Sequence, residues 1–156
     1  MQAVSDATPL IHLSKISKIS YLKHLFNKII IPKEVFNEIV VKGREFNKKD
    51  VILIEQLIEE NFIVVKESSS KITIPNLHSG ELKIKNLMID DKEGFDAALI
   101  LGLHPLRTTS LLLRLLHKKR ITFNEYNKSL LNLSESGYFL RAEIYEKLLE
   151  AGRKVK

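Results

Sequence analysis

Short apolar runs alternate with longer amphipathic stretches along the whole chain. The apolar runs are rich in Ile, Leu and Val and are bounded by polar or turn-forming residues, which favours β-strands. They occur at residues 2–5, 28–31, 62–65 and 86–90, with a fifth near Leu106. Strands that alternate with helices predict a mainly parallel sheet covered on both faces. We therefore expect a three-layer α/β/α domain with about four to five short strands.

Capping and breaking residues mark the expected helix boundaries. Pro32 stands where the first turn of a helix tolerates proline, and Gly43 is expected to end that helix. Asn47 and Asp91 are each placed to cap a later helix. The expected helices begin near Thr8 and Ser20 and then span about 32–42, from 47 onward, 91–102, 109–117, 123–134 and 140–151.

Length and composition limit the class of protein. A chain of 156 residues fits one domain with one core, so we expect residues 1–156 to form a single domain, with the helices at about 123–151 packing on it or extending it. The absence of cysteine excludes disulfides and thiolate metal sites. We find no membrane-spanning run and no signal peptide pattern, so we expect a cytoplasmic protein without a membrane partner.

The net charge is +6, which leaves two interpretations open. A basic protein favours a polyanionic partner such as RNA or DNA. Alternatively, the lysines form a solvated surface, because they are spread along the chain rather than clustered. The closest approach to a basic patch is the run 117–120, with Arg114 one turn earlier.

Acidic and hydroxyl side chains follow the expected strands. Asp6 follows the first strand, Asp90 and Asp91 follow the fourth, and Thr108 follows the last. In a parallel sheet these positions gather at the carboxyl ends of the strands, where ligands bind. Several carboxylates in one crevice favour Mg²⁺ or Mn²⁺, and such an ion supports phosphodiester hydrolysis. The alternative for Asp6 and Asp91 is a helix cap, which is the commoner role of Asp before a helix.

Glu38 is a third acidic candidate, placed on the helix that begins near Pro32. At about 100° per residue, Glu38 lies about 60° from Val35, on the flank of the apolar stripe that Val35 and Ile39 define. A carboxylate on such a flank needs a partner. Without the other acids, Glu38 would be only a boundary residue of the helix.

Four segments of the chain resemble the motifs of PIN domains, in the branch similar to VapC toxins. They are AVSDATPLIHLSKI, IIIPKEVFNEIVVKG, LHSGE and NLMIDDKEG, and the ending GYFLRAEIYEKLLEAG also fits that branch. The resemblance covers nearly the whole chain. It implies a Rossmann-like PIN domain that acts as an Mg²⁺- or Mn²⁺-dependent endoribonuclease, held inactive by an antitoxin protein.

The resemblance also assigns roles to individual residues. The four expected catalytic acids are Asp6, Glu38, Glu81 and Asp90. Of these, Asp6, Glu38 and Asp90 are expected to bind the cation, with Glu81 or Asp91 completing the set. The supporting residues are expected to be Thr8, Arg107 and Thr108.

The chain departs from the family pattern in its third and fourth motifs. The GEL segment leads through Lys83 directly into a strand, so one crossover helix is expected to be missing within 67–85. Phe95 stands where the family usually has arginine, and Arg107 stands in place of a glycine. These departures predict weak or absent cleavage with retained cation binding. They also predict a homodimer in which a second copy covers the uncovered sheet.

Two alternatives to an active ribonuclease remain. The first is a degenerate PIN domain that binds RNA or a protein without cleavage. The second is an interaction module that dimerises through the leucine-rich helix at 111–116, although burial in the core is the expectation for Leu112, Leu115 and Leu116. None of the five histidines has the spacing of a zinc motif, and none is assigned to metal.

Overall fold

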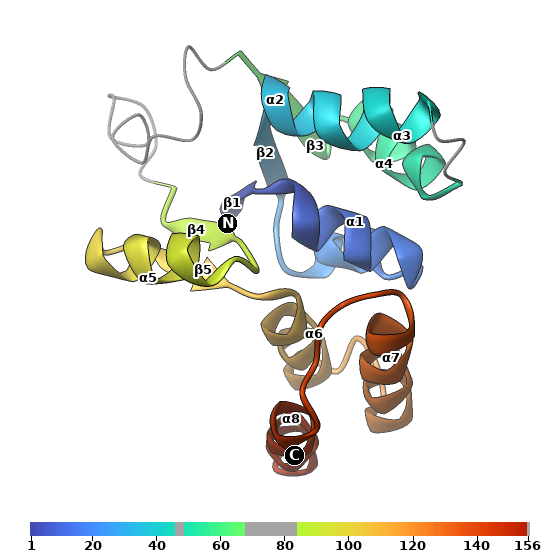
Figure 1. The fold of residues 1–156 in the computed structure, drawn as a ribbon, viewed down its shortest axis with the longest axis vertical. Helices are drawn as coiled ribbons and strands as arrows, with labels where there is room; N and C mark the ends of the chain where they lie inside the picture. Colours follow the sequence, from blue (N-terminus) through green and yellow to red (C-terminus); the bar gives the residue numbers. More distant parts are fainter. Residues whose placement is uncertain (46–48, 68–83, 156) are drawn as a thin grey trace.

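In the part of the chain that the structure describes, five parallel strands form one sheet in the order β3-β2-β1-β4-β5 (Figure 1). The computed structural model of the protein describes residues 1–45, 49–67 and 84–155. The strands are β1 (Gln2–Ser5), β2 (Lys28–Pro32), β3 (Ile63–Lys66), β4 (Asn86–Met88) and β5 (His104–Leu106). Every neighbouring pair is parallel. The predicted α/β fold with a parallel sheet is confirmed, and β4 ends two residues earlier than expected.

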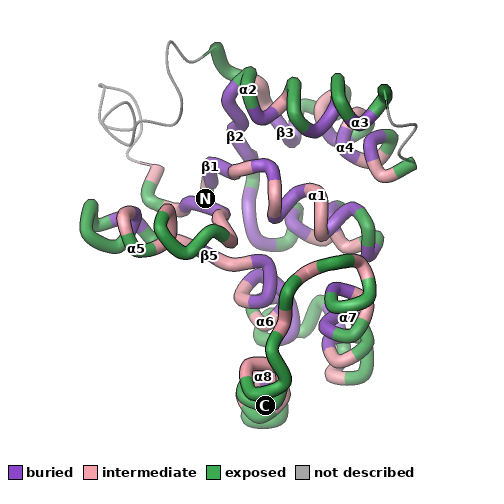
Figure 2. Tube along the Cα trace, viewed as in Figure 1, coloured by how far each residue is buried: buried purple, intermediate pink, exposed green. Residues whose placement is uncertain are grey.

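Side chains of the central strands alternate between two cores, one on each face of the sheet. On β2, Ile29 and Ile31 join the larger core while Ile30 joins the smaller one. On β4, Met88 and Leu87 divide in the same way. This alternation follows from the two-residue period of a strand. Figure 2 shows the resulting burial along β1, β2 and the adjoining side of α1.

The helices cover the two faces unequally. The larger core receives α1 (Ala7–Lys15), the 3₁₀ helix η1 (Ile19–His24), α4 (Asp50–Glu59), α6 (Thr108–His117) and α7 (Phe123–Glu135), with partly buried side chains of α8 (Ala142–Arg153) packed against it. The smaller core receives Ala98 of α5 (Lys92–Ile100). Helices therefore pack on both faces of the sheet, as the three-layer prediction requires.

The segment after β2 is one helical path with a wider turn in its middle. It consists of α2 (Lys33–Phe36), a π-helical turn η2 (Asn37–Val41) and α3 (Lys42–Glu45). The prediction that Gly43 ends this helix is wrong, since Gly43 is buried inside α3. A Cβ at Gly43 would lie 2.4 Å from Cγ2 of Val51 on α4. Gly43 therefore allows the close approach of α3 and α4.

The second helix also differs from its prediction. Ser20 was expected to cap an α-helix, but η1 begins at Ile19 and its cap residue, Lys18, makes no side-chain capping bond. The chain must return to β2 by Lys28, and 3₁₀ turns are the usual form of such short connectors. The expected Asn47 cap of α4 lies outside the described residues.

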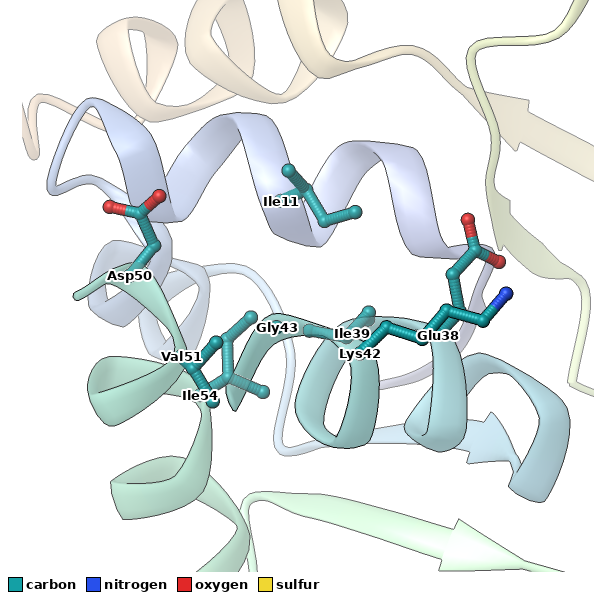
Figure 3. Close-up of a pocket in the computed structure, with 8 residues that line it drawn as sticks. All are labelled: Ile11, Glu38, Ile39, Lys42, Gly43, Asp50, Val51 and Ile54. Atoms are coloured by element: carbon teal, nitrogen blue, oxygen red, sulfur yellow. The ribbon is translucent and has the colours of Figure 1, made fainter. Parts of the chain in front are cut away.

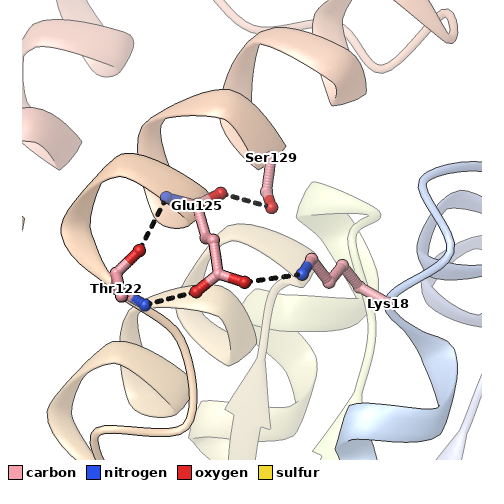
Figure 4. Close-up of polar contacts among 4 residues, drawn as sticks. All are labelled: Lys18, Thr122, Glu125 and Ser129. Carbon is pink, nitrogen blue, oxygen red and sulfur yellow. Dashed lines mark hydrogen bonds and ion pairs between the residues drawn. The ribbon is translucent and has the colours of Figure 1, made fainter.

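The C-terminal helices form a group at one end of the molecule (Figure 1). Helix α7 begins with a capping box, in which Thr122 N–H donates to Glu125 Oε2 at 2.7 Å and Glu125 N–H donates to Thr122 Oγ1 at 3.2 Å. Figure 4 shows this box together with Lys18, whose ammonium lies 3.9 Å from Glu125 Oε1. The Tyr126 hydroxyl donates to the Leu148 carbonyl at 3.0 Å, which ties α7 to α8.

Helix α6 is a core helix of the single chain. As expected, Leu112, Leu115 and Leu116 are buried, and so is Leu111. Leu113 is half-buried against the same core, and dimerisation through this helix stays a prediction.

The chain passes from β3 to β4 through residues 68–83, so the predicted loss of a crossover helix falls outside the described residues. Within the described segments, no helix is both long and apolar enough to cross a membrane.

Candidate functional site at the carboxyl ends of β1 and β4

The order of the strands places a switch point between β1 and β4. From β1 the chain continues to β2 and β3 on one side, and β4 and β5 then lie on the other side of β1. In open parallel sheets, ligands bind outside the carboxyl ends of the two strands that flank such a point. The candidate site is therefore expected where β1 and β4 end.

Asp6 and Asp90 lie at this edge. Ser5 pairs with Met88 in the register of β1 and β4, and the Asp6 N–H donates to the Met88 carbonyl at 3.0 Å. Asp6 is thus the first residue after β1, and Asp90 is the second residue after β4. Both are half-buried. The two carboxylates that the sequence placed after separate strands therefore follow neighbouring strands at one edge of the sheet.

Asp6 and Asp91 precede helices but behave differently. The Asp91 carboxylate accepts the Gly94 N–H at 2.6 Å and caps α5. Asp6 occupies the equivalent position before α1 with extended backbone, but its side chain makes no capping bond. Capping therefore accounts for Asp91, and it does not account for Asp6.

The Asp90 carboxylate is held by hydrogen bonds from two different parts of the chain. Oδ1 accepts the Thr108 N–H at 2.9 Å and the Tyr138 hydroxyl at 2.8 Å. Oδ2 accepts the Thr108 hydroxyl at 2.6 Å. Thr108 is fully buried at the start of α6. Thr108 thus fixes the orientation of Asp90, and its supporting role at a metal site stays a prediction.

Arg107 lies next to the same carboxylate but binds the backbone. Its Nη1 donates to the Asp90 carbonyl at 2.8 Å, and its guanidinium carbon lies 4.5 Å from the centre of the Phe95 ring. The arginine and the phenylalanine that depart from the family pattern are therefore stacked against each other. The hydrogen bond to the Asp90 carbonyl holds the loop after β4 to the start of α6, and the stacking adds a contact with α5.

Glu38 lies on the π-helical turn and is exposed, not buried on the flank of the stripe. A π turn is wider than an α turn, so the 100° wheel used for the prediction does not apply there. Glu38 lines a pocket of about 220 Å³ together with Ile11 of α1, Ile39, Lys42 and four further residues (Figure 3). Figure 3 shows the Lys42 side chain extending toward the same end of the pocket as Glu38. Glu38 therefore faces α1, the helix that follows Asp6.

Two residues named in the sequence analysis lie outside the described residues. They are Glu81, the fourth acid, and Lys83, which follows the GEL segment. Thr8 is half-buried in the first turn of α1.

Two residues near Asp90 were not predicted from the sequence. The ring of Tyr138 meets the ring of His12 edge-on, with centres 5.0 Å apart. Burial, followed by the negative charge of Asp90, raises the pKa of Tyr138. Burial, followed by Lys15, lowers the pKa of His12, and the charge of Asp90 opposes this. Tyr138 is 48 positions from Asp90, so no local pattern signals the contact.

A PIN domain family model matches residues 2–153 of the chain. The chain belongs to the PIN domain family. Searches of curated proteins and of solved structures found no match. The predicted family is thereby confirmed, whereas the branch similar to VapC toxins stays a prediction. A PIN domain is a nuclease-type fold, and PIN domains generally use divalent metal ions.

The carboxylates of this PIN domain offer oxygen ligands for a divalent ion. Carboxylate oxygens are the ligands that Mg²⁺ and Mn²⁺ prefer, and Mg²⁺ usually keeps several waters beside one or two carboxylates. Within residues 1–45, 49–67 and 84–155, no three acidic or histidine side chains lie close enough together to hold a metal ion. The donor chemistry of Asp6 and Asp90 therefore fits a hydrated cation. The roles of Asp6, Glu38, Glu81, Asp90 and Asp91 as metal ligands stay predictions.

Proposed function

We propose that this PIN domain is a metal-dependent endoribonuclease that hydrolyses RNA phosphodiesters. The observation that carries the proposal is the placement of Asp6 and Asp90 at the switch point between β1 and β4. Asp6 and Asp90 would hold Mg²⁺ or Mn²⁺, with Glu38 and Glu81 as the further acids of the site. A bound divalent ion supplies an activated water and offsets the negative charge of the phosphate.

Residues of this chain support the proposal through charge and orientation. The net charge of +6 favours association with a polyanion. Among the cations near the acids, Lys42 lines the pocket that also holds Glu38, and Arg107 contacts the backbone of Asp90. The exposed basic run at 117–120 lies at the C-terminal end of α6, whereas Thr108 lies at its N-terminal end. This run would therefore contact RNA at a distance from the site of cleavage. The three hydrogen bonds to Asp90 hold one ligand in a fixed orientation before an ion arrives.

A cleavage assay tests the proposal. RNA is incubated with Mn²⁺ or Mg²⁺ and the wild type, Asp6→Asn, or Asp96→Asn, which changes an exposed aspartate of α5 and serves as the matched control. We expect slow metal-dependent cleavage that Asp6→Asn abolishes and Asp96→Asn leaves intact. Cleavage that Asp6→Asn leaves unchanged would contradict the proposal and indicate a contaminating nuclease.

A second candidate function is a PIN domain that binds RNA or protein without cleavage. Two observations favour it: the engagement of both Asp90 oxygens by hydrogen bonds, and the use of Asp91 as a helix cap. Under this alternative the wild type would bind RNA in a gel-shift assay, and Mn²⁺ would produce no cleavage products above those of Asp6→Asn.

Further proposals concern partners and location. We propose a toxin of the VapC-like branch in the cytoplasm, with a cognate antitoxin and a second copy of the chain as protein partners. Leu99, Ile100 and Leu101 at the end of α5 are 54%, 86% and 44% exposed, and such apolar clusters favour protein contacts. Sedimentation that gives only monomer at micromolar concentration would contradict self-association.

A further inference from the structure

We propose that Tyr138 is a positioning residue of the site, which makes the turn between α7 and α8 part of the metal centre. This inference rests on the metal-dependent function proposed above. The observation behind it is a single hydrogen bond between elements far apart in sequence, from the Tyr138 hydroxyl to Asp90 Oδ1 at 2.8 Å.

The end of α7 fixes the position of Tyr138. Gly137 has φ +96°, a left-handed conformation that glycine adopts without strain. The Tyr138 N–H donates to the Leu133 carbonyl at 3.0 Å, and the Gly137 N–H donates to the Ser134 carbonyl at 3.3 Å. This is the hydrogen-bonding pattern of a Schellman cap, which turns the chain sharply at a helix end. The tyrosine is thus presented by a rigid turn.

Contacts of the ring complete the placement. Tyr138 is half-buried, and its ring packs edge-on against His12 of α1 with 5.0 Å between centres. Because α1 begins directly after Asp6, the ring lies between the helix that follows one acid and the carboxylate of the other. The turn at the end of α7 and the contact with His12 therefore both fix the position of the phenol that donates to Asp90.

The hydrogen bonds divide the two oxygens of Asp90 between different tasks. Each carboxylate oxygen offers about two lone pairs. Oδ1 uses both of its lone pairs, on Thr108 N–H and on the Tyr138 hydroxyl, whereas Oδ2 accepts only the Thr108 hydroxyl among the described residues. One lone pair of Oδ2 is therefore the position at which Asp90 can bind a cation.

The hydrogen bond from Tyr138 constrains the Asp90 carboxylate in a way that the bonds from Thr108 do not. Both bonds from Thr108 come from one residue at the start of α6, so the carboxylate could still tilt about that residue. The bond from Tyr138 comes from a different element and opposes this tilt. Groups that orient a metal ligand typically change metal affinity about 10–100-fold when they are mutated.

The test is Mn²⁺ binding to the full chain, measured by calorimetry for matched tyrosine variants. Tyr138→Phe removes the hydroxyl and keeps the ring against His12. Tyr145→Phe is the control, because its hydroxyl donates to Asn127 Oδ1 between α7 and α8. We expect Tyr138→Phe to bind Mn²⁺ roughly tenfold more weakly than wild type, and Tyr145→Phe to bind with wild-type affinity.

Two further measurements separate positioning from a general loss of structure. In an Asp90→Asn background, Tyr138→Phe should cause no additional loss of Mn²⁺ affinity, because it acts through Asp90. Without metal, the Thr108 amide should exchange its hydrogen faster in Tyr138→Phe than in wild type or Tyr145→Phe, since its acceptor is less firmly held.

Wild-type affinity in Tyr138→Phe would overturn the inference and leave the proposed function standing. The inference would also be overturned if Tyr138→Phe weakened Mn²⁺ binding by the same factor in the wild-type and the Asp90→Asn backgrounds. A wild type that binds no Mn²⁺ would instead refute the metal centre itself, and the inference would fall with it.

Discussion

Replacing Thr108 with valine tests how firmly the candidate site is built into the fold. Valine has nearly the same shape as threonine and keeps the backbone N–H that donates to Asp90. The substitution removes one contact, the hydroxyl that lies 2.6 Å from Asp90 Oδ2. That contact joins the loop after β4 to the first turn of α6.

The expected magnitude follows from the environment of the contact. A hydrogen bond to a charged group contributes about 1.5–3 kcal/mol to stability. Thr108 is fully buried, but Asp90 is half-buried, so water can replace the lost donor in part. We therefore expect the lower value, a loss of about 1.5 kcal/mol. For a domain of this size, that corresponds to a fall in Tm of about 3–6 °C.

Urea unfolding of a double-mutant cycle measures this contribution. The four proteins are wild type, Thr108→Val, Asp90→Asn and the double variant. If the hydroxyl acts on the carboxylate, Thr108→Val should cost clearly less in the Asp90→Asn background, with a coupling free energy of about 1 kcal/mol. Equal costs in both backgrounds would refute the reasoning, because the loss would then come from packing around Thr108 alone.

Two further substitutions test the fold away from the site. Gly43→Ala should destabilise the protein by about 1–2 kcal/mol, because overpacking outweighs the gain in helix propensity. Val51→Ala removes the clashing methyl group, so the losses of unfolding free energy in urea should be less than additive when the two substitutions are combined. Full additivity would argue against the close contact of α3 and α4. Glu125→Gln keeps the capping box but removes a carboxylate whose pKa is lowered below 4.5 by hydrogen bonds from the Thr122 backbone and side chain. The stability from this charge is present above about pH 4.5 and is lost as the pH falls through the lowered pKa. The variant should therefore melt below wild type at about pH 7, and the difference in Tm should shrink as the solution is acidified; a difference that does not change with pH would contradict this.

The sequence by itself determined the elements and their kind. Apolar runs such as 28–31 form buried strands because Ile, Leu and Val alternate between two cores, and the parallel sheet follows from helices that separate those strands. It also indicated that Asp6 and Asp90 follow strands, and the motif resemblance identified the family that the match to residues 2–153 confirms. These properties depend on near neighbours in the chain, which a linear pattern records.

Only the tertiary structure decided how these residues meet. No local pattern indicated that Gly43 lies inside a helix, because glycine is needed there to make room for a methyl group of Val51 on the next helix. Nor did it separate Asp91, which caps α5, from Asp6, which makes no capping bond, since both precede a helix. The bond from Tyr138 to Asp90 spans 48 positions and depends on the packing of the C-terminal helices against α1 and α6. Such contacts arise when distant surfaces become complementary, and no local pattern of hydrophobic and polar residues carries that information.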